Sequence, residues 1–345
     1  MLVGAPFELP DGSVLADFAS LARRNWQIVP LLRSALQHSG QERHRPAAWV
    51  EFLNESLAVE AFSAVQVEAL GEVCAALGEA RIRYALLKSS AVRLTCYGDP
   101  VHRTGWDLDV AVAHHDLGAV TEVLEELGYA ASQFNPLTRR FGAADPQLRA
   151  AVEAEHYELG FMVRRNRVRG LSRGERAAIS GRLAESRHWH SDDNGELCCY
   201  TTIDVHHGLS LEISASELLL SAKPFIWNTR EVWIPSLAWL AFHVIYKVYW
   251  EGVHAYGKGL YQYADLCRIV GRMQEKDACE LIALLDAAHL RAAGYYVLRR
   301  LPTALGTPLP DSLTDYVAAC AHPEAQDPVA CNDLGDMWDK LWNRR

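Results

Sequence analysis

Apolar side chains recur at helical spacing over two stretches near the start of the chain, Val14 to Leu36 and Ala47 to Leu77. In both stretches the apolar positions fall three or four residues apart, as they do on one face of an α-helix. A polar insert, residues 37–46, separates the two stretches. The pattern predicts an all-helical layer that covers a sheet.

The middle third of the chain contains short apolar runs of the length expected for strands. They are Tyr84 to Leu87, a run that opens at Gly105, Tyr129 to Phe134, His156 to Val163, and Leu197 to Val205. A helical segment follows the first run, and another, Asp116 to Leu127, is closed by Gly128 at a natural C-cap position. This mixture of strands and helices predicts an α/β or α+β unit.

From Ala215 onward the apolar spacing becomes helical again. Three helices are predicted, at Ser236 to Trp250, Tyr261 to Met273 and Ala278 to Leu301, and a short final helix is predicted at Trp338 to Trp342. We therefore expect an α+β protein in which a small mixed β-sheet lies between an N-terminal helical layer and a C-terminal helical lobe. The predicted divisions are residues 1–80 for the N-terminal helical region, 81–215 for the sheet-containing core, 216–300 for the lobe and 301–345 for the tail.

Composition and charge limit the functional classes. The chain has 345 residues, of which 50% are hydrophobic, so it can bury a sizeable core. Its net charge of −9 argues against a general nucleic-acid-binding surface, which would show as clustered Lys and Arg. Local basic runs at residues 164–169 and 173–182 are predicted to form a solvated hairpin turn and a helix, with a binding surface as the alternative.

The expected location is the cytoplasm, without a membrane segment. The eight cysteines show no C-x-x-C pair, which is typical of free thiols in a reducing compartment. The first residues lack the basic and apolar segments of a secretory signal. The longest apolar stretch, Val232 to Tyr246, is too short to span a bilayer.

The candidate chemistry lies between Tyr84 and Val112. Asp107 and Asp109 are two residues apart, so on an extended strand their side chains project to the same face. Adjacent carboxylates repel each other unless a cation lies between them, and hard divalent cations such as Mg²⁺ take oxygen ligands. This spacing is what a metal-dependent phosphoryl or nucleotidyl transferase needs, although Asp-x-Asp alone is also common in turns and at strand starts.

Other catalytic signatures are missing from the sequence. There is no Walker A loop, no G-x-G-x-x-G after a strand, no H-E-x-x-H and no G-x-S-x-G. The pairs Cys198-Cys199 and His206-His207 do not have the usual spacing of a zinc site.

Several short motifs occur in a fixed order along the chain. They are Leu87-Lys88, a short helix, Tyr97-x-Asp99-Pro100-x-x-Arg103-x-x-x-Asp107-x-Asp109 and, much later, Ile203-Asp204-Val205-His206. This order resembles an uncharacterised family of bacterial nucleotidyltransferases in the DNA polymerase beta-like superfamily, from the N-terminal helices to about residue 300. The sequence departs from the family pattern at Ser89, where the family usually has Gly, and at Trp106, which displaces Gly105 by one position.

The resemblance implies a role for each matching residue. Asp107, Asp109 and Asp204 would form the catalytic triad and bind the metal, most simply two Mg²⁺ ions, with Mn²⁺ as an alternative. Ser89 and Ser90 open a helix whose N-terminus favours phosphate, and Ser90 is the better candidate for a side-chain contact.

Other residues would complete the nucleotide and substrate sites. The cationic candidates for the triphosphate are Lys88, Arg103, Lys247 and Lys258. The candidates for substrate contact or for orienting the aspartates are His206, His156 and Glu158.

Structural roles are the alternatives for the same side chains. Asp204 would then form a buried salt bridge with Lys88 or Arg103, and Arg103 would pair with Asp99 or Asp107. His156 and Glu158 would be a structural pair. Lys247 would lie on a solvated helix face.

The predicted function is transfer of a nucleoside monophosphate from a nucleoside triphosphate, for example ATP, to a hydroxyl or phosphate acceptor, with release of pyrophosphate. A small-molecule acceptor is favoured. The alternatives are a catalytically inactive nucleotide- or partner-binding module of the same fold, which Ser89 in place of Gly supports, and a toxin-like enzyme that modifies tRNA or protein, which the basic segment 164–182 supports. The base preference, the acceptor and the oligomeric state are left open by the sequence.

Overall fold

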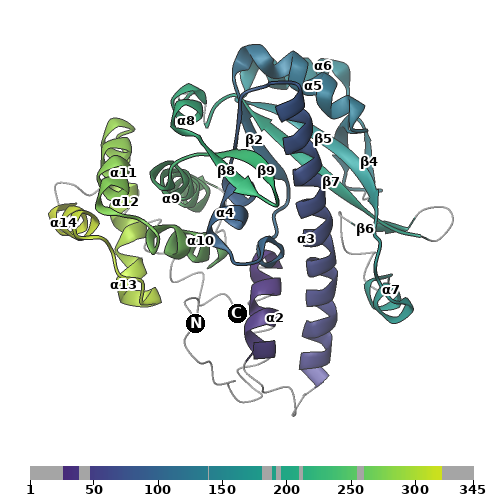
Figure 1. Cartoon of the computed structure of the whole chain (residues 1–345), viewed down its shortest axis with the longest axis horizontal. Coiled ribbons are helices and arrows are strands. Elements are labelled where there is room, and N and C mark those ends of the chain that lie inside the picture. The colour runs from purple at the N-terminus through teal and green to yellow at the C-terminus, as the bar shows by residue number, and fades with distance from the viewer. Residues whose placement is uncertain are drawn as a thin grey trace. The chain divides into compact units, whose positions relative to one another are not determined.

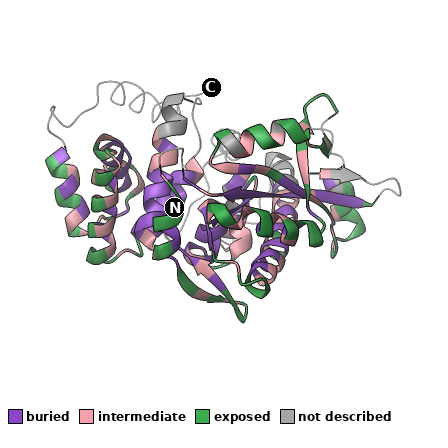
Figure 2. Cartoon of the chain, turned by 90° about the horizontal axis from the view of Figure 1, so that it is seen from above, coloured by how far each residue is buried: buried purple, intermediate pink, exposed green. Residues whose placement is uncertain are grey.

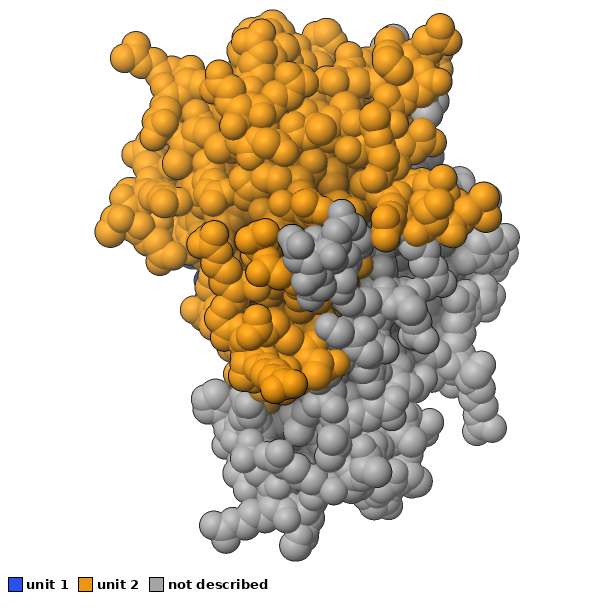
Figure 3. All heavy atoms as spheres, turned by 90° about the vertical axis from the view of Figure 1, so that its right-hand side faces the viewer, with its two compact units in different colours: residues 1–6, 235–345 blue, residues 7–234 orange. Residues whose placement is uncertain are grey.

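The computed structural model describes residues 26–38, 47–138, 140–180, 189–191, 196–209, 213–254 and 260–320. These residues form two compact units, and the division between them falls between Ile234 and Pro235. The unit that precedes this division is called the first unit below; Figure 3 shows it in orange, where its key labels it unit 2. It contains both the N-terminal helices and the sheet.

The predicted N-terminal helices are present where the structure describes them. A 3-10 turn, η1 (Trp26–Ile28), leads into α2 (Val29–His38), and α3 (Ala47–Glu79) is a single long helix. Residues 14–25 of the first predicted helix lie outside the described residues. Within α3, Ser56–Glu79 is long and apolar enough to cross a membrane, but half of its most apolar window is buried inside the protein. A core helix passes the same test, so this is weak evidence for a membrane span.

The centre of the first unit is a seven-stranded mixed sheet (Figure 1). Its strands are β1 (Tyr84–Leu86), β2 (Leu108–Val112), β3 (Ala130–Asn135), β4 (Arg140–Ala143), β5 (Glu158–Arg167), β6 (Trp189–Ser191) and β7 (Leu197–His206). Six of them lie in the order β1-β2-β7-β5-β3-β4, and β6 pairs with the beginning of β7. The strands β2 and β7 are parallel, whereas the other pairs are antiparallel. This arrangement confirms the predicted α+β class.

Short helices connect the strands of the first unit. They are α4 (Lys88–Cys96), η3 (Pro100–His102), η4 (His114–Asp116), α5 (Leu117–Glu126), α6 (Pro146–Glu155), α7 (Arg173–Ser180) and α8 (Ser216–Ser221). The predicted C-cap at Gly128 has a φ of +83°, the left-handed conformation that favours glycine. A hairpin of β8 (Lys223–Trp227) and β9 (Arg230–Ile234), which the sequence reading did not include, ends the unit.

The basic run after Val163 is not the predicted turn. The strand β5 continues to Arg167, which pairs with Cys198 of β7. The strand tolerates the charges because the inward Arg164 reaches Glu72 of α3 and the carbonyl of Leu127, whereas Arg165 and Arg167 are exposed. The predicted helix after the run is present as α7.

The second unit is helical, as predicted, but its first helix is longer than predicted and the last predicted helix is divided. They are α9 (Leu237–His254), α10 (Leu260–Val270), α11 (Glu275–Ala287), α12 (Arg291–Leu298), α13 (Arg300–Leu305) and α14 (Asp311–Cys320). The single helix predicted over residues 278–301 is wrong, because the chain turns at His289, whose φ of +55° is incompatible with a continuous helix. The predicted helix at Trp338 to Trp342 lies outside the described residues.

The core of the first unit lies against one face of the sheet. Leu108 and Val110 of β2 and Ile203 and Val205 of β7 are almost completely inaccessible to solvent. Figure 2 shows buried residues in purple. Because side chains alternate along a strand, the residues between these apolar positions point to the opposite face. They include Asp109 and Asp204.

Candidate active site

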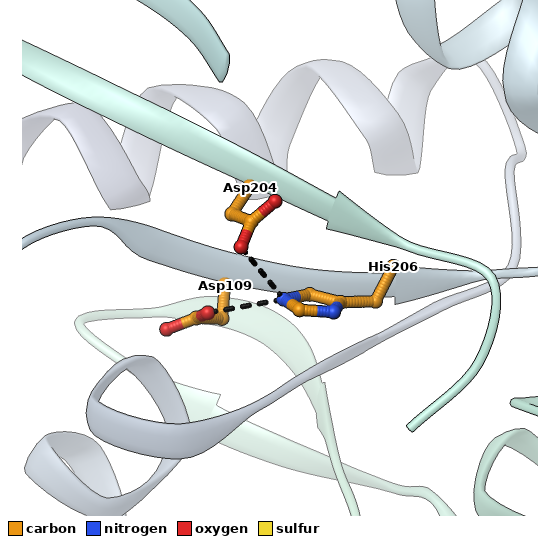
Figure 4. Close-up of side chains that lie close together, drawn as sticks. All are labelled: Asp109, Asp204 and His206. Atoms are coloured by element: carbon orange, nitrogen blue, oxygen red, sulfur yellow. Dashed lines mark hydrogen bonds and ion pairs between the residues drawn. The ribbon is translucent and has the colours of Figure 1, made fainter. Parts of the chain in front are cut away.

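Asp109 and Asp204 lie side by side on the parallel strands β2 and β7. Their Cα atoms are partners in the strand register, so both side chains project from the same face of the sheet (Figure 4). Both carboxylates are buried. A buried pair of like charges is costly unless cations or hydrogen-bond donors compensate for it.

His206 is the first group that offsets the repulsion between the two buried carboxylates. It is two residues beyond Asp204 on β7 and projects from the same face. Its Nε2 lies 3.1 Å from Oδ1 of Asp109 and 3.2 Å from Oδ2 of Asp204 (Figure 4). Its Nδ1 lies 3.4 Å from Oε1 of Glu158 on β5. The imidazole is therefore surrounded by acidic groups from three strands.

Lys88 is the second group that offsets the repulsion between the two carboxylates. Its Nζ lies 2.6 Å from Oδ1 of Asp109, 3.8 Å from Oδ2 of Asp204 and 3.2 Å from Nε2 of His206. The backbone of Lys88 has a φ of +45°, a left-handed conformation that costs a non-glycine residue about 1–2 kcal/mol. Backbone strain of this kind persists only where the surrounding structure fixes it, and it clusters at functional sites.

The electrostatics favour charged forms throughout this cluster. Burial disfavours an ionised Asp109, but Lys88 and His206 outweigh it and lower the pKa of Asp109 to about 2. The pKa of Asp204 is also lowered, since His206 and Lys88 offset the effect of its burial. Burial and the Lys88 charge disfavour imidazolium, yet the two aspartates raise the pKa of His206 to about 9. The pKa of Lys88 rises despite burial, with Asp109 as the largest favourable influence.

Asp107 stands slightly apart from the other two aspartates. It precedes β2, is half-buried, and is not one of the three residues whose ligand atoms lie within 4.8 Å of one another, Asp109, Asp204 and His206. Burial, together with repulsion from Asp109, raises the pKa of Asp107 to about 7. Asp107 thus interacts with the cluster through charge, and a cation nearby would favour its ionised form.

The two serines have different positions at the start of α4. The Ser90 hydroxyl accepts a hydrogen bond of 2.9 Å from the backbone N–H of Asp109, so it holds β2 against the helix. The Ser89 side chain lies against Gly105, where an added Cβ would come within 2.4 Å of the Ser89 Oγ. The two departures from the family pattern therefore touch each other: the larger residue at position 89 is accommodated because position 105 is glycine.

A buried polar network fixes the loop that precedes Asp107. Gln66 of α3 donates to the Gly105 carbonyl at 3.0 Å, and it accepts from the Gly105 N–H at 3.2 Å and from the Thr104 hydroxyl at 2.9 Å. Arg93 of α4 donates to the Arg103 carbonyl at 2.8 Å and to the Ser63 hydroxyl at 2.9 Å. The sequence reading missed this network. The sequence did contain a signal for it, because Gln66 and Arg93 are polar residues among the apolar positions of two helices.

The remaining predicted site residues are placed as follows. The buried Arg103 side chain donates from Nη1 to the Thr104 carbonyl. Glu158 is near His206, and His156 Nδ1 lies 4.0 Å from Oε2 of Glu158, so both residues belong to this edge of the site. Lys247 lies on α9 in the second unit and is half-buried, whereas Lys258 is outside the described residues.

Comparison with known proteins assigns the family. The model of a family described as uncharacterised nucleotidyltransferase matches residues 15–306. The chain belongs to this family. Among solved structures, it is similar to an antigenic nucleotidyltransferase-like protein from Paracoccidioides brasiliensis, with 14% sequence identity, a TM-score of 0.36, and coverage of 74% of this chain and 94% of that one. No curated protein matches the sequence.

The acidic cluster of this nucleotidyltransferase fits a divalent cation. Oδ2 of Asp109 and Oδ1 of Asp204 are buried and have no hydrogen-bond partner among the described residues. Buried polar atoms are normally satisfied, so these two oxygens are candidates for metal coordination. Carboxylate oxygens suit Mg²⁺ and Mn²⁺. His206 would have to lose its second proton before Nε2 could bind a metal, and a neutral imidazole suits transition metals such as Mn²⁺ better than it suits Mg²⁺.

Proposed function

We propose that the protein is a divalent-cation-dependent enzyme that transfers a nucleoside monophosphate from a nucleoside triphosphate to an acceptor and releases pyrophosphate. The observation that carries the proposal is a pair of buried carboxylate oxygens, on Asp109 and Asp204, that no described residue hydrogen-bonds, in a member of a nucleotidyltransferase family. The proposed acceptor group is a hydroxyl or a phosphate, most simply on a small molecule in the cytoplasm.

The three aspartates would hold the cation. Asp109 and Asp204 supply facing oxygens, and Asp107 lies close enough to add its charge. His206 would offer a nitrogen to the same space once cation binding displaces its proton. We propose Mg²⁺, most simply two ions, with Mn²⁺ as the alternative that the imidazole favours. Bound cations in such sites stabilise the attacking and leaving oxygens of an in-line displacement.

The protein's own groups would bind and orient the substrates. The N–H groups at the start of α4, where the side chain of the N-cap residue Leu87 does not cap the helix, favour phosphate, and the side chain of Ser90 already holds Asp109. Lys88 neutralises the aspartates in this structure, and we propose that it turns to the triphosphate when that substrate binds. Arg103 is a further candidate for the phosphates. Glu158 and His156 would orient His206 and line the acceptor side.

An inactive nucleotide- or partner-binding module is the second candidate, and a specific contact favours it. The Lys88 ammonium group lies 2.6 Å from Asp109 and so already supplies a cation to the acidic cluster. A protein that kept the fold without catalysis could retain this internal ion pair. Modification of tRNA or protein is a third candidate, supported by the exposed Arg165, Arg169 and Arg173.

The test is pyrophosphate release from each of the four nucleoside triphosphates, with Mg²⁺, Mn²⁺ or EDTA, followed by detection of labelled nucleoside monophosphate on an acceptor. Wild type should release pyrophosphate only with a divalent cation. Asp109→Asn and Asp204→Asn should lose this activity by about a hundredfold or more, as expected for a loss of electrostatic stabilisation of several kcal/mol. Asp116→Asn, a carboxylate outside the site, is the matched control. Nucleotide binding without pyrophosphate release would instead support the binding module.

A further inference from the structure

The strand β5 carries one extra residue opposite the acidic cluster. Glu158 pairs with His206 and Phe161 pairs with Asp204, so three steps along β5 correspond to two steps along β7. This mismatch is a β-bulge. Gly160 lies within it and has a φ of +83°, a conformation that suits glycine and few other residues.

The bulge decides where the Phe161 side chain points. In a regular strand, residues three apart face opposite sides of the sheet. With the bulge, Glu158 faces His206 and Phe161 faces Asp204, so both project from the face that carries the cluster. Asp109, Asp204 and Phe161 thus form one row across β2, β7 and β5.

Phe161 is exposed although it lies within the sheet. Its relative exposure is 41%, whereas Met162, which points to the other face, is 1% exposed. The side chain therefore adds little to the core, and it places an aromatic ring in solvent on the face that carries the buried carboxylates. Paired residues across antiparallel strands have Cβ atoms about 4.5–5.5 Å apart, so the Phe161 side chain starts beside that of Asp204.

The position of the Phe161 ring indicates which of the two substrates, triphosphate or acceptor, it would contact. This inference rests on the proposed function. The phosphate-binding start of α4 lies beside β2, where Ser90 holds Asp109. In an in-line displacement the attacking and leaving oxygens lie on opposite sides of the transferred phosphorus. If the triphosphate binds at the start of α4, the attacking hydroxyl approaches the phosphorus from the opposite side, which is the β5 side where Phe161 lies.

We propose that Phe161 is a specificity-determining residue that contacts a ring on the acceptor, so that the acceptor is a small hydroxyl compound carrying an aromatic or other flat apolar group. Favourable aromatic contacts correspond to about a three- to tenfold preference for a ring-bearing acceptor over its ring-free counterpart. The bulge at Gly160 is what makes this contact available.

The experiment measures binding rather than turnover. The full chain with Mg²⁺ is titrated, by ligand-observed NMR, with phenyl and methyl β-glucoside and with the phenyl and methyl ethers of glycerol. Within each pair the hydroxyl groups are the same and only the ring differs. Wild type should bind the phenyl member of each pair about three- to tenfold more tightly. Phe161→Ala should abolish the preference and Phe161→Tyr should keep it.

Leu220→Ala removes another exposed apolar side chain and serves as the control, because it should leave the preference unchanged. Equal binding of both members by wild type, absence of binding, or a preference that survives Phe161→Ala would overturn the proposal. The pyrophosphate assay is a separate readout. A protein that prefers the phenyl probes but releases no pyrophosphate would refute the proposed function and leave the ring contact standing.

Discussion

Asp109 and Asp204 face each other across the parallel strands β2 and β7, and one oxygen of each carboxylate has no hydrogen-bond partner in the part of the chain that the structure describes. The other oxygens share His206 and Lys88. The arrangement brings together two carboxylates that are far apart in the sequence. Each is held by a strand whose alternate side chains are buried in the core, so the site is positioned by the central sheet of the first unit.

Cation binding should depend on both facing aspartates. A cation present at a hundred times its dissociation constant would stabilise the wild-type protein by about 2.7 kcal/mol. Asp204→Asn removes one charged ligand and should abolish most of the cation-dependent rise in melting temperature, whereas Asp116→Asn should keep it. Melting curves in Mg²⁺, Mn²⁺ and EDTA measure the effect. An equal rise in all three proteins would place the cation elsewhere.

Removal of the internal ammonium group should make the protein depend on an added cation. Lys88→Met keeps the length of the side chain but leaves Asp109 without its closest cationic partner. Loss of one partner of a buried ion pair costs about 3–5 kcal/mol, so the variant should unfold at lower denaturant concentration in EDTA. Mg²⁺ should then restore more stability to the variant than to wild type. Equal denaturation midpoints in EDTA would show that Lys88 does not compensate for the carboxylates.

Much of the fold could be predicted from local patterns in the sequence. The spacing of apolar residues predicted α3, β1, β2, β7 and the helical second unit, because each of these elements buries a periodic face. The predicted break after α5 was also right, since a glycine with positive φ ends it. The errors fall where local and tertiary signals conflict. Arginines that suggested a turn lie in β5, because strand pairing and Glu72 stabilise them there.

The candidate site could be predicted only in part from the sequence. The Asp-x-Asp spacing and the later Asp-x-His indicated acidic residues on two strands, and the structure places Asp109, Asp204 and His206 together. The hydrogen bonds of Gln66 and Arg93 could not be predicted from the sequence, because a buried hydrogen bond between distant residues leaves no periodic pattern. The orientation of Phe161 depends on a one-residue register shift, and a sequence does not show which strand faces which.

The buried thiols should stay unreactive at mildly alkaline pH. Burial raises the pKa of Cys74 and of Cys199 to about 12, so both remain thiols in the folded protein at pH 8, whereas Cys279 is exposed. Because the folded state holds these protons more tightly than the unfolded state does, the protein should lose stability as the pH rises from 9 towards 12. Thiol labelling followed by mass spectrometry should modify Cys279 in the native protein, and Cys74 and Cys199 only after unfolding. Native modification of either buried cysteine at the rate of Cys279 would contradict this.

Gln66 should control both stability and the order of the loop before Asp107. Gln66→Leu keeps the approximate volume but leaves the Gly105 amide group and the Thr104 hydroxyl without their buried partner. Each unsatisfied buried group costs about 1–3 kcal/mol, so the variant should lose several kcal/mol of unfolding free energy in urea. Ser63→Ala removes a single hydrogen bond to Arg93 and should cost about 1 kcal/mol. Hydrogen exchange separates a local effect from a global one. The Gly105 amide should exchange faster in Gln66→Leu under native conditions, while the amides of β7 stay protected; unchanged exchange at Gly105 would show that the loop is held by other contacts.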